Sequence, residues 1–344
     1  MTNYSDNVQV NTNLLSLCQF VLAILVIALH CQRIFENDSL HFIQKSLFSR
    51  LAVPFFMLST GFFLAKAQKE GRSLKQWAAK FGKNYLFWSV FYLPYALSYF
   101  AQTQLSISCF PVGLLIALLY TGTCYHLWYL VAVLEGVCLL SFLKKYLNSK
   151  TVFLICLSLY SFGLLETYFA YLDGSGLGLL YQNYQQIFYT ARNGLFFAPI
   201  FLYLGSWAYQ HYHRPVLAKR LKTKLGLSLL AFVGEGWLIF QNQGIDKNFF
   251  LSLIPVTLLL FNWAIRSSLF REKAWQKLKA YSVYYFFLHP IFVEISFAWL
   301  NTKDWPIWTK GQLAFVIALI LTHALSSCIL HFRAKGLLKI GSFG

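Results

Sequence analysis

Several ionisable side chains stand inside long apolar stretches of this 344-residue chain. They are histidine, arginine and glutamate, which move protons and hold anions in proteins. An ionised group at the centre of a bilayer costs roughly 2.5–3.5 kcal/mol on insertion scales, so such residues usually mark a site. Together with two polar or aromatic neighbours, the candidate site residues are His30, Arg50, His126, Trp128, Glu166, Arg192, Asn193, His289 and Glu294.

These residue types indicate two kinds of chemistry. A histidine can take a proton from a hydroxyl because its pKa lies near neutrality, and a carboxylate can orient the imidazole. An arginine offers a planar fork for a phosphate, a carboxylate or an oxyanion. The set therefore suits acyl transfer to a hydroxyl, and it equally suits a transporter that binds a zwitterionic solute. The chain has no Walker loop, G-x-S-x-G elbow, H-E-x-x-H motif or dinucleotide fingerprint, which argues against ATP-driven transport by this chain alone.

The same residues also admit purely structural interpretations. A histidine at a helix end can be interfacial, and an arginine can extend its head group to the lipid phosphates. Trp128 can belong to an interfacial belt of aromatics. Glu135 and Glu235 can pair with polar groups inside a bundle, and His323 can be a packed histidine with a single hydrogen bond.

The elements that must position these residues are helices that cross a membrane. The chain is 58% hydrophobic and 12% charged, and a soluble domain would carry about twice that charged fraction. We predict an all-α polytopic membrane protein, a single domain over residues 1–344 with about ten transmembrane helices in one bundle. The predicted spans are 14–34, 46–66, 82–102, 125–143, 151–171, 192–211, 223–241, 247–266, 280–300 and 311–332, because apolar runs of about 20 residues cross a bilayer.

Basic residues alternate between rich and poor loops along the chain. The rich segments are 66–83, 144–150, 214–224, 266–279 and the tail from residue 333. By the positive-inside rule they face the cytoplasm, and both termini lie there too. The net charge of +17 is then a topology signal and an attraction to anionic membrane lipids, so we expect no nucleic-acid partner. This topology brings the candidate site residues into the outer half of a cell-membrane protein, as a polar chamber that opens outward.

The stretch YYFFLHPIFVEI, residues 284–295, places a proline inside a predicted span. Pro290 cannot donate a backbone hydrogen bond and disturbs the carbonyl of Phe286, so we expect a kink beside His289. Two roles of this kink remain as alternatives: it bends the helix only, or it also shapes a site.

The seven cysteines are scattered, without CxxC or Cys/His clusters, so we expect neither a zinc site nor any other metal site. Small apolar packing residues are the expected role of these cysteines, with a bridge between Cys109 and Cys124 as the alternative.

Five segments in order resemble the membrane acyltransferase-3 family. The first span closes on a histidine in FVLAILVIALH, at His30, and the second opens with an arginine in RLAVPFFMLSTGFF, at Arg50. HLWYLVAVL, ARNGLFFAPIFLYLG and YYFFLHPIFVEI resemble three later segments of the family, and the resemblance covers nearly the whole chain.

The resemblance implies an O-acyltransferase that moves an acetyl or other short acyl group from acyl-CoA onto an envelope glycan or a lipid-linked sugar. It implies His30 as the catalytic histidine and Arg50 and Arg192 as site residues. We interpret Glu166 as the group that orients a base, and the other candidates as substrate-binding residues. A separate extracytoplasmic transferase or a second copy of the chain is a candidate partner.

One position departs from the family pattern. Members often carry a basic residue eleven positions before the first-span histidine, where this chain has Gln19, which can hydrogen-bond but cannot neutralise a phosphate. HLWYL and RNGLFF also resemble a branch that forms the membrane half of serine racemases linked to glycopeptide resistance, and we expect the racemase half to be absent here. A transporter for a small polar solute such as serine is therefore the second hypothesis, and a non-catalytic membrane scaffold is the third.

Overall fold

The structure is a computed structural model that describes residues 9–337, and every regular element among them is helical. Residues 1–8 and 338–344 lie outside the described residues, and with them the predicted cytoplasmic position of both termini. The helices are α1 (Thr12–His30), α2 (Asp38–Phe42), α3 (Ala52–Lys69), α4 (Leu74–Phe91), α5 (Leu93–Gln102), α6 (Phe110–Ile116), α7 (Trp128–Tyr146), α8 (Ser149–Thr167), α9 (Phe169–Leu172), α10 (Gly176–Phe188), α11 (Ala198–Gln210), α12 (Pro215–Ala218), α13 (Leu221–Gln241), α14 (Leu253–Arg266), α15 (Lys277–Leu300) and α16 (Ile307–Ala334).

Six helical segments among the described residues are long and apolar enough to cross a membrane. They are Thr12–His30, Asp38–Lys69, Ser149–Thr167, Leu221–Gln241, Lys277–Leu300 and Ile307–Ala334. The all-helical membrane fold is thereby confirmed. Each of the ten predicted segments overlaps one of the helices, while the count of ten crossings stays a prediction.

Three predicted spans differ from the helices that the structure contains. The segment 82–102 divides at Tyr92 between α4 and α5, and Pro94 stands in the first turn of α5, where its missing N–H is tolerated. Residues 192–197 form a turn before α11, and residues 247–252 form a loop before α14. The side chains of Asn193 and Glu235 accept hydrogen bonds from the backbone in these two places.

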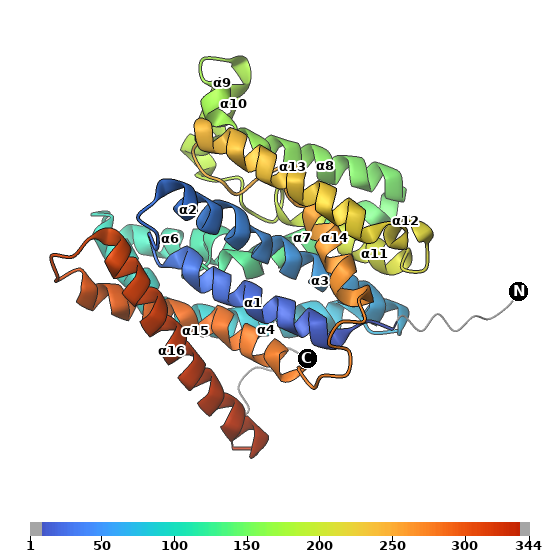
Figure 1. Ribbon diagram of the computed structural model, residues 1–344. Coiled ribbons are helices and arrows are strands. Elements are labelled where there is room, and N and C mark those ends of the chain that lie inside the picture. Colours follow the sequence, from blue (N-terminus) through green and yellow to red (C-terminus); the bar gives the residue numbers. More distant parts are fainter. Residues whose placement is uncertain (1–8, 338–344) are drawn as a thin grey trace, which may run out of the picture.

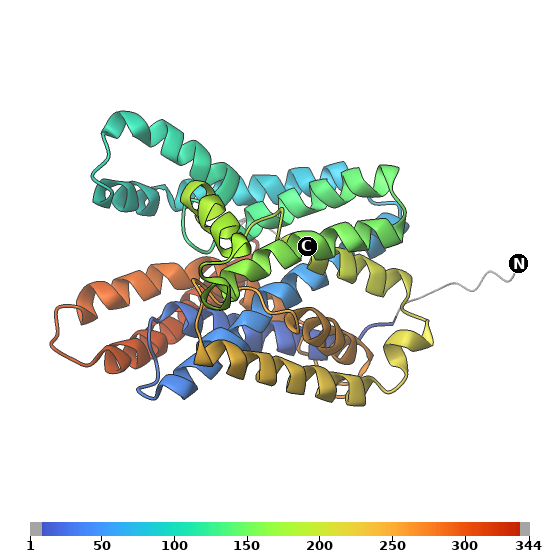
Figure 2. The same cartoon turned by 90° about the horizontal axis from the view of Figure 1, so that it is seen from above.

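Most helices run roughly parallel or antiparallel in one bundle, with α16 crossing obliquely and packing along α15 (Figure 1). Viewed from above, α5 and α6 form an arm at one edge of the bundle (Figure 2). We call the end formed by the loops 70–73, 147–148, 211–220 and 267–276 the basic end, because these loops lie within or beside the Lys- and Arg-rich segments 66–83, 144–150, 214–224 and 266–279. The opposite end is formed by segments 31–37, 103–106, 122–127, 189–197, 242–252 and 301–306.

The closest helix pair in the bundle is α3 with α11, and two glycines permit it. A Cβ added at Gly61 would lie 2.2 Å from the backbone oxygen of Leu202, and one at Gly205 would lie 2.0 Å from that of Leu58. Lipid offers no hydrophobic force between helices, so such close backbone packing carries their association. The α3–α11 pair is therefore the rigid frame beside which the polar residues are arranged.

Candidate functional site

Three histidines from different parts of the chain meet towards the opposite end. His30 is the last residue of α1, His126 lies just before α7, and His289 lies within α15. The ring centroids of His30 and His289 are 5.3 Å apart, and those of His126 and His289 are 5.6 Å apart. Tyr125 stands beside them, with its ring centroid 4.5 Å from that of His30. We call these four residues the histidine cluster.

Local structure fixes each histidine in place. Gly122, with φ of +79°, reverses the chain after α6, and Leu127 N donates to Cys124 O, so a tight turn presents His126. In α15, Pro290 leaves the preceding turn short of one donor. The Tyr92 hydroxyl donates to Phe287 O there. This carbonyl is next to that of Phe286, which Pro290 deprives of its donor; α15 is assigned as one helix across this point, and the predicted kink stays a prediction.

The hydrogen bonds of the cluster determine the protonation of one ring. Nδ1 of His289 lies 2.8 Å from the carbonyl oxygen of Tyr285, and a carbonyl only accepts, so Nδ1 carries the hydrogen. In the neutral ring Nε2 then holds the lone pair. That Nε2 is buried and has no partner among the described residues, and the same holds for both nitrogens of His126 and for the Tyr125 hydroxyl. Since unpartnered buried polar atoms are costly, this concentration fits a site that receives a polar group.

A second group, the arginine cluster, consists of Arg50, Glu166, Arg192, Asp246 and Asn248. The two Nη atoms of Arg50 donate to Asn248 Oδ1 and, at 2.9 Å, to Asp246 Oδ1. Asn248 Nδ2 donates to Glu166 Oε1 at 2.8 Å and to Asp246 Oδ2 at 2.7 Å. Arg192 reaches the same Asn248 Oδ1 at 3.4 Å. The asparagine therefore joins both arginines to both carboxylates.

Glu166 is almost fully buried at the end of α8 and is held from several sides. Its Oε2 accepts from the Tyr181 hydroxyl, from Thr190 Oγ1 at 3.1 Å and from Ala191 N at 3.0 Å. None of the hydrogen bonds of Glu166 within the described residues goes to a histidine. Its predicted role, the orientation of a base, stays a prediction, and in the structure it orients Asn248.

Arg192, Trp128 and Asn193 lie at the turn that precedes α11. The guanidinium carbon of Arg192 is 4.7 Å from the ring centroid of Trp128, a cation–π contact. Asn193 Oδ1 accepts from the backbone N–H groups of Leu195 and Phe196 at 2.9 and 3.0 Å. These bonds delay the helix of the predicted span 192–211 to Ala198, because they satisfy the backbone of the turn without helix. Asn193 is thereby occupied in shaping the turn, and substrate binding by it stays a prediction.

The two clusters adjoin each other, and one candidate lies apart. His30 interacts electrostatically with both Arg50 and Arg192. Glu294 is solvent- or lipid-exposed on α15 and reaches the histidine cluster only through its electrostatic interaction with Tyr125. The structure thus brings the predicted site residues to one end of the bundle, with Glu294 at the margin.

Asp246 is one of the two carboxylates that balance the charges of the two arginines, with Glu166 as the other. Burial alone would raise the pKa of the Asp246 carboxyl, but Arg50 and Arg192, with donors from Lys247 N and Asn248, hold that pKa below its ordinary range. The Nε atoms of Arg50 and Arg192 are buried and have no partner among residues 9–337. Each arginine therefore keeps one N–H donor for an oxyanion.

The sequence also predicted structural roles for Glu135, Glu235, His323 and the cysteines, and the structure shows the contacts of each. Glu235 accepts from Leu251 N and Ser252 N at 2.6 and 2.8 Å, which caps α14 and explains why 247–252 is a loop. Glu135 accepts from Gly194 N at 3.2 Å. His323 makes one hydrogen bond, 2.8 Å, with the Tyr285 hydroxyl, as predicted, but its side chain is exposed and not packed. The predicted pairing of Glu135 and Glu235 with polar groups of the bundle is confirmed. All seven cysteines are free, so the alternative bridge between Cys109 and Cys124 is wrong: one is exposed and the other buried.

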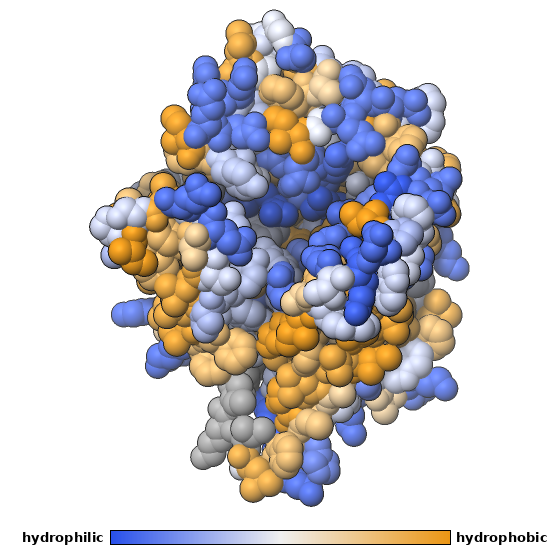
Figure 3. Space-filling model, turned by 90° about the vertical axis from the view of Figure 1, so that its left-hand side faces the viewer, coloured by the Kyte–Doolittle hydropathy of each residue, from blue (hydrophilic) through white to orange (hydrophobic). Residues whose placement is uncertain are grey.

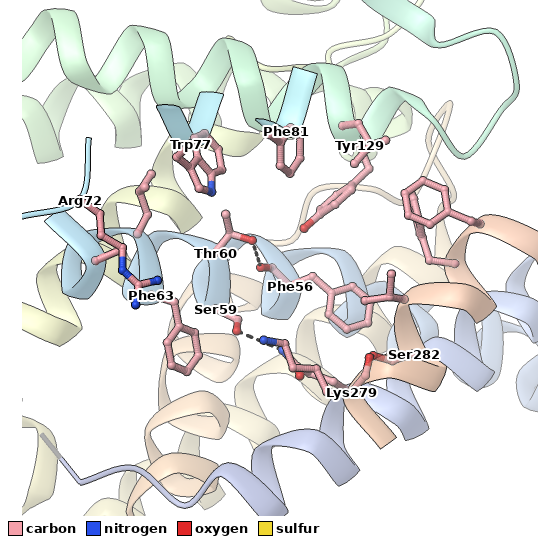
Figure 4. Close-up of a pocket in the computed structure, with 17 residues that line it drawn as sticks. Phe56, Ser59, Thr60, Phe63, Arg72, Trp77, Phe81, Tyr129, Lys279 and Ser282 are labelled. Carbon is pink, nitrogen blue, oxygen red and sulfur yellow. Dashed lines mark hydrogen bonds between the residues drawn. The ribbon is translucent and has the colours of Figure 1, made fainter. Parts of the chain in front are cut away.

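A cavity of about 320 Å³ enters the bundle between α1, α3, α4, α7 and α15 (Figure 4). Its wall is mostly aromatic and aliphatic, including Phe63, Trp77, Phe81 and Tyr129, and we call it the apolar pocket. The cationic side chains in its lining, Arg72 and Lys279, come from the basic end.

The inner wall of the apolar pocket touches the histidine cluster. Phe286 lines the pocket, and its ring centroid is 5.1 Å from that of His126 and 5.4 Å from that of Tyr129. At the opposite end the protein surface is hollowed at its centre, with hydrophilic residues around the hollow (Figure 3). A single aromatic ring thus separates the pocket from the histidines.

Sequence reasoning missed several residues of this arrangement. Asp246 and Asn248 were not predicted as site residues, because the predicted span 247–266 begins between them. An acidic residue at the edge of a span could have indicated the site. The apolar pocket gave no signal, because its wall is aromatic and aliphatic and comes from five separate segments. Within residues 9–337 no group of three His, Cys, Asp or Glu is arranged to hold a metal ion.

Comparison with known proteins decides the family. A model of the acyltransferase domain matches residues 14–331, nearly the whole chain. The chain belongs to this acyltransferase family. The resemblance seen in the five sequence segments is thereby confirmed, and the multi-pass membrane character agrees with the apolar helices of the fold.

Curated relatives of this acyltransferase-family chain carry racemase names. An amino-acid racemase of Enterococcus faecalis is 30% identical over 257 residues, which cover 71% of this chain and 34% of that protein. A serine/alanine racemase of Enterococcus gallinarum is 29% identical over 321 residues, 88% of this chain and 43% of that protein. The chain spans less than half of the length of either relative. No solved structure matches it.

Proposed function

We propose that this protein is an O-acyltransferase of the cell membrane that moves a short acyl group, an acetyl group first of all, from acyl-CoA to a hydroxyl of an envelope glycan or lipid-linked sugar. The observation that carries the proposal is the contact of Phe286 with His126, 5.1 Å between ring centroids. The apolar pocket from the basic end and the polar clusters of the opposite end meet at this contact. A donor and an acceptor that arrive from different sides would react there.

The apolar pocket supports acyl-CoA as the donor. An acyl group and the uncharged arm of the donor suit an aromatic and aliphatic wall, while Arg72 and Lys279 suit its phosphates. By the positive-inside rule the basic end faces the cytoplasm, where acyl-CoA is made. The acceptor would enter through the hydrophilic hollow at the opposite end.

His30 is the proposed general base. It stands at the end of α1 beside His289, Arg50 and Arg192. It takes the proton of the acceptor hydroxyl as the hydroxyl oxygen bonds to the thioester carbonyl carbon, and the carbonyl becomes an oxyanion. The unpartnered Nε–H groups of Arg50 and Arg192 suit that oxyanion. When the oxyanion collapses, the C–S bond breaks and the imidazolium returns its proton to the leaving thiolate.

His126, His289 and Trp128 would bind and orient rather than react. His289 offers only a lone pair at Nε2 and so can accept from a donor that approaches it. Trp128 holds the Arg192 guanidinium flat. We further propose that Glu166 acts through Asn248 on both arginines, and that Glu294 contacts the acceptor at the margin of the site. A separate extracytoplasmic transferase or a second copy of the chain would complete the transfer to the polymer.

The second candidate is a permease for serine or a similar solute, which the serine/alanine racemase relative favours by its name. In that case the paired arginines and carboxylates of the arginine cluster bind the zwitterion. One experiment separates the two. The gene is deleted, the O-acyl content of envelope polymers is measured by mass spectrometry, and uptake of labelled serine is measured in the same cells.

A loss of O-acyl groups with unchanged serine uptake supports the transferase. A loss of uptake with unchanged O-acyl content contradicts it and supports the permease. Re-expression of the wild-type chain and of His30→Ala from one promoter is the matched control, because both restore the protein but only the wild type is expected to restore the acyl groups.

A further inference from the structure

Gln19 has a side-chain amide oxygen that accepts no hydrogen bond within the described residues. Its side chain is 8% exposed and lines the apolar pocket. Nε2 donates to the Ser59 hydroxyl oxygen at 3.1 Å, which fixes the orientation of the amide. Oε1 is buried without a partner, and no other lining residue of the pocket in the described part of the chain has such a side-chain atom.

Two other hydroxyls of the lining are bound to their own helices. Thr60 Oγ1 donates to Phe56 O at 2.9 Å (Figure 4), and Ser282 Oγ donates to Lys279 O at 2.8 Å. The Ser59 hydroxyl accepts from Gln19, and the Tyr129 hydroxyl bonds Thr60. Gln19 Oε1 is thus an acceptor that a ligand in the pocket can bond without competing with the fold. A carbonyl oxygen only accepts, so the ligand must bring an N–H or O–H.

We propose that Gln19 Oε1 accepts an amide N–H from the uncharged pantetheine arm of the acyl-CoA donor, and so selects donors that carry an amide there. This inference rests on the proposed function. The arm contains two amides and one pantoyl hydroxyl between the thioester and the phosphates, and the rest of its length is apolar, as the pocket wall is. Equal binding of the arm and of both ester analogues, each of which lacks one amide N–H, would assign the bond to the hydroxyl and not to an amide. A pocket that hydrogen-bonds a ligand N–H rejects an analogue without it, because the carbonyl is then left buried and unpaired.

The position of Gln19 agrees with this assignment. It precedes His30 by eleven residues of one helix, a rise of about 16 Å. With the thioester at the histidine cluster and the phosphates at Arg72 and Lys279, the arm would run past Gln19 on its way through the pocket.

The test uses the full chain in lipid nanodiscs and compares three competitors of labelled acetyl-CoA. They are S-acetylpantetheine and two analogues in which one or the other amide N–H is replaced by an ester oxygen. Wild type should bind one ester analogue about 10-fold more weakly than S-acetylpantetheine, the loss of one buried hydrogen bond. Gln19→Leu should bind the two ligands equally, and Gln19→Glu, which keeps an acceptor, should retain the discrimination.

Thr60→Ala is the matched control, because its hydroxyl lines the same pocket but is bound to its own helix, and it should discriminate as wild type does. Two results overturn the inference and leave the proposed function standing. One is that Gln19→Leu still binds an ester analogue more weakly than S-acetylpantetheine, and the other is that wild type binds all three competitors equally. Absence of acetyl-CoA binding to wild type overturns the proposed function, and the inference with it.

Discussion

Nδ1 of His289 lies 2.8 Å from the carbonyl oxygen of Tyr285, one turn earlier in α15. The carbonyl fixes the hydrogen on Nδ1 and leaves the buried Nε2 as the only lone pair of the ring. A ring fixed in this way cannot pass a proton through itself. The bond rules out a relay between the two nitrogens of His289, although Nε2 can still take a proton. The assignment of His30 as the base therefore rests on its place at the end of α1 beside Arg50 and Arg192.

Replacing His289 by alanine should lower kcat of acyl transfer by about 100-fold, because misplacing a reacting group by about 1 Å can cost that much. KM for acetyl-CoA should change little, since His289 does not line the apolar pocket. The measurement is steady-state transfer to a soluble sugar acceptor. His323→Gln is the control, because that histidine bonds only the Tyr285 hydroxyl. Equal kcat in wild type and His289→Ala would refute the assignment.

Arg50 should not tolerate lysine. Its guanidinium bonds Asn248 and Asp246 at once, and a single ammonium cannot reproduce this fork. Arg50→Lys should reduce transfer about 10-fold or more at unchanged expression. Arg33→Lys is matched to it, because Arg33 also pairs with an aspartate, Asp38, but that carboxylate is largely exposed, so the change should be negligible. A similar effect of both substitutions would contradict the site role of Arg50.

The arginine cluster also predicts a pH dependence. The pKa of Asp246 is lowered in the folded protein, so the stability from this carboxylate is fully present above its unfolded value, about 3.9. It is lost as pH falls through the lowered folded value. Thermal unfolding should show Asp246→Asn less stable than wild type by the same amount from pH 8 to pH 5, and the difference should shrink below pH 4.

The size of that difference should be modest, because the Asp246 side chain is 38% exposed and the ion pair is screened by solvent. A difference that stays constant down to pH 3 would show that the carboxylate does not contribute through its charge.

The contact between α3 and α11 predicts which glycines the fold needs. Valine at Gly61 or Gly205 would collide with the facing backbone, and overpacking of this kind costs about 1–3 kcal/mol or more. Both variants should lower the Tm of the protein in detergent. Gly82→Ala in α4 is the control, because nothing lies within 4 Å of its added Cβ, and it should leave the Tm unchanged or slightly higher. An unaltered Tm in Gly61→Val would mean that the two helices lie further apart.

Hydropathy and charge alternation predicted the helical membrane fold, because bilayer length and loop charge are read directly from residue types. They also predicted that His30, His126 and His289 belong to one end of the bundle. They could not predict where the helices begin inside two of the predicted spans. The helices start only at Ala198 and Leu253, after turns that Asn193 holds by local hydrogen bonds and Glu235 of α13 holds from outside.

The sequence also could not predict which side chains of the site hydrogen-bond to one another. Glu166 was expected beside a histidine, and the structure pairs it with Asn248 and Tyr181 instead. Hydrogen bonds between α8, α10 and the 242–252 loop depend on three-dimensional register, which residue spacing along the chain does not encode. Gln19 stood out in the sequence only as a departure from a family pattern, and its unused carbonyl became visible in the pocket.

The central claim is that His30 deprotonates an acceptor hydroxyl at the meeting point of a donor pocket and an outward-facing chamber. The most direct test is acyl transfer by the purified chain in proteoliposomes, with labelled acetyl-CoA and a sugar acceptor, for wild type and His30→Ala. The account predicts O-acetylated sugar with wild type, and with His30→Ala a loss of at least about 100-fold in rate while acetyl-CoA still binds. Equal rates of O-acetylation by the two proteins would contradict it.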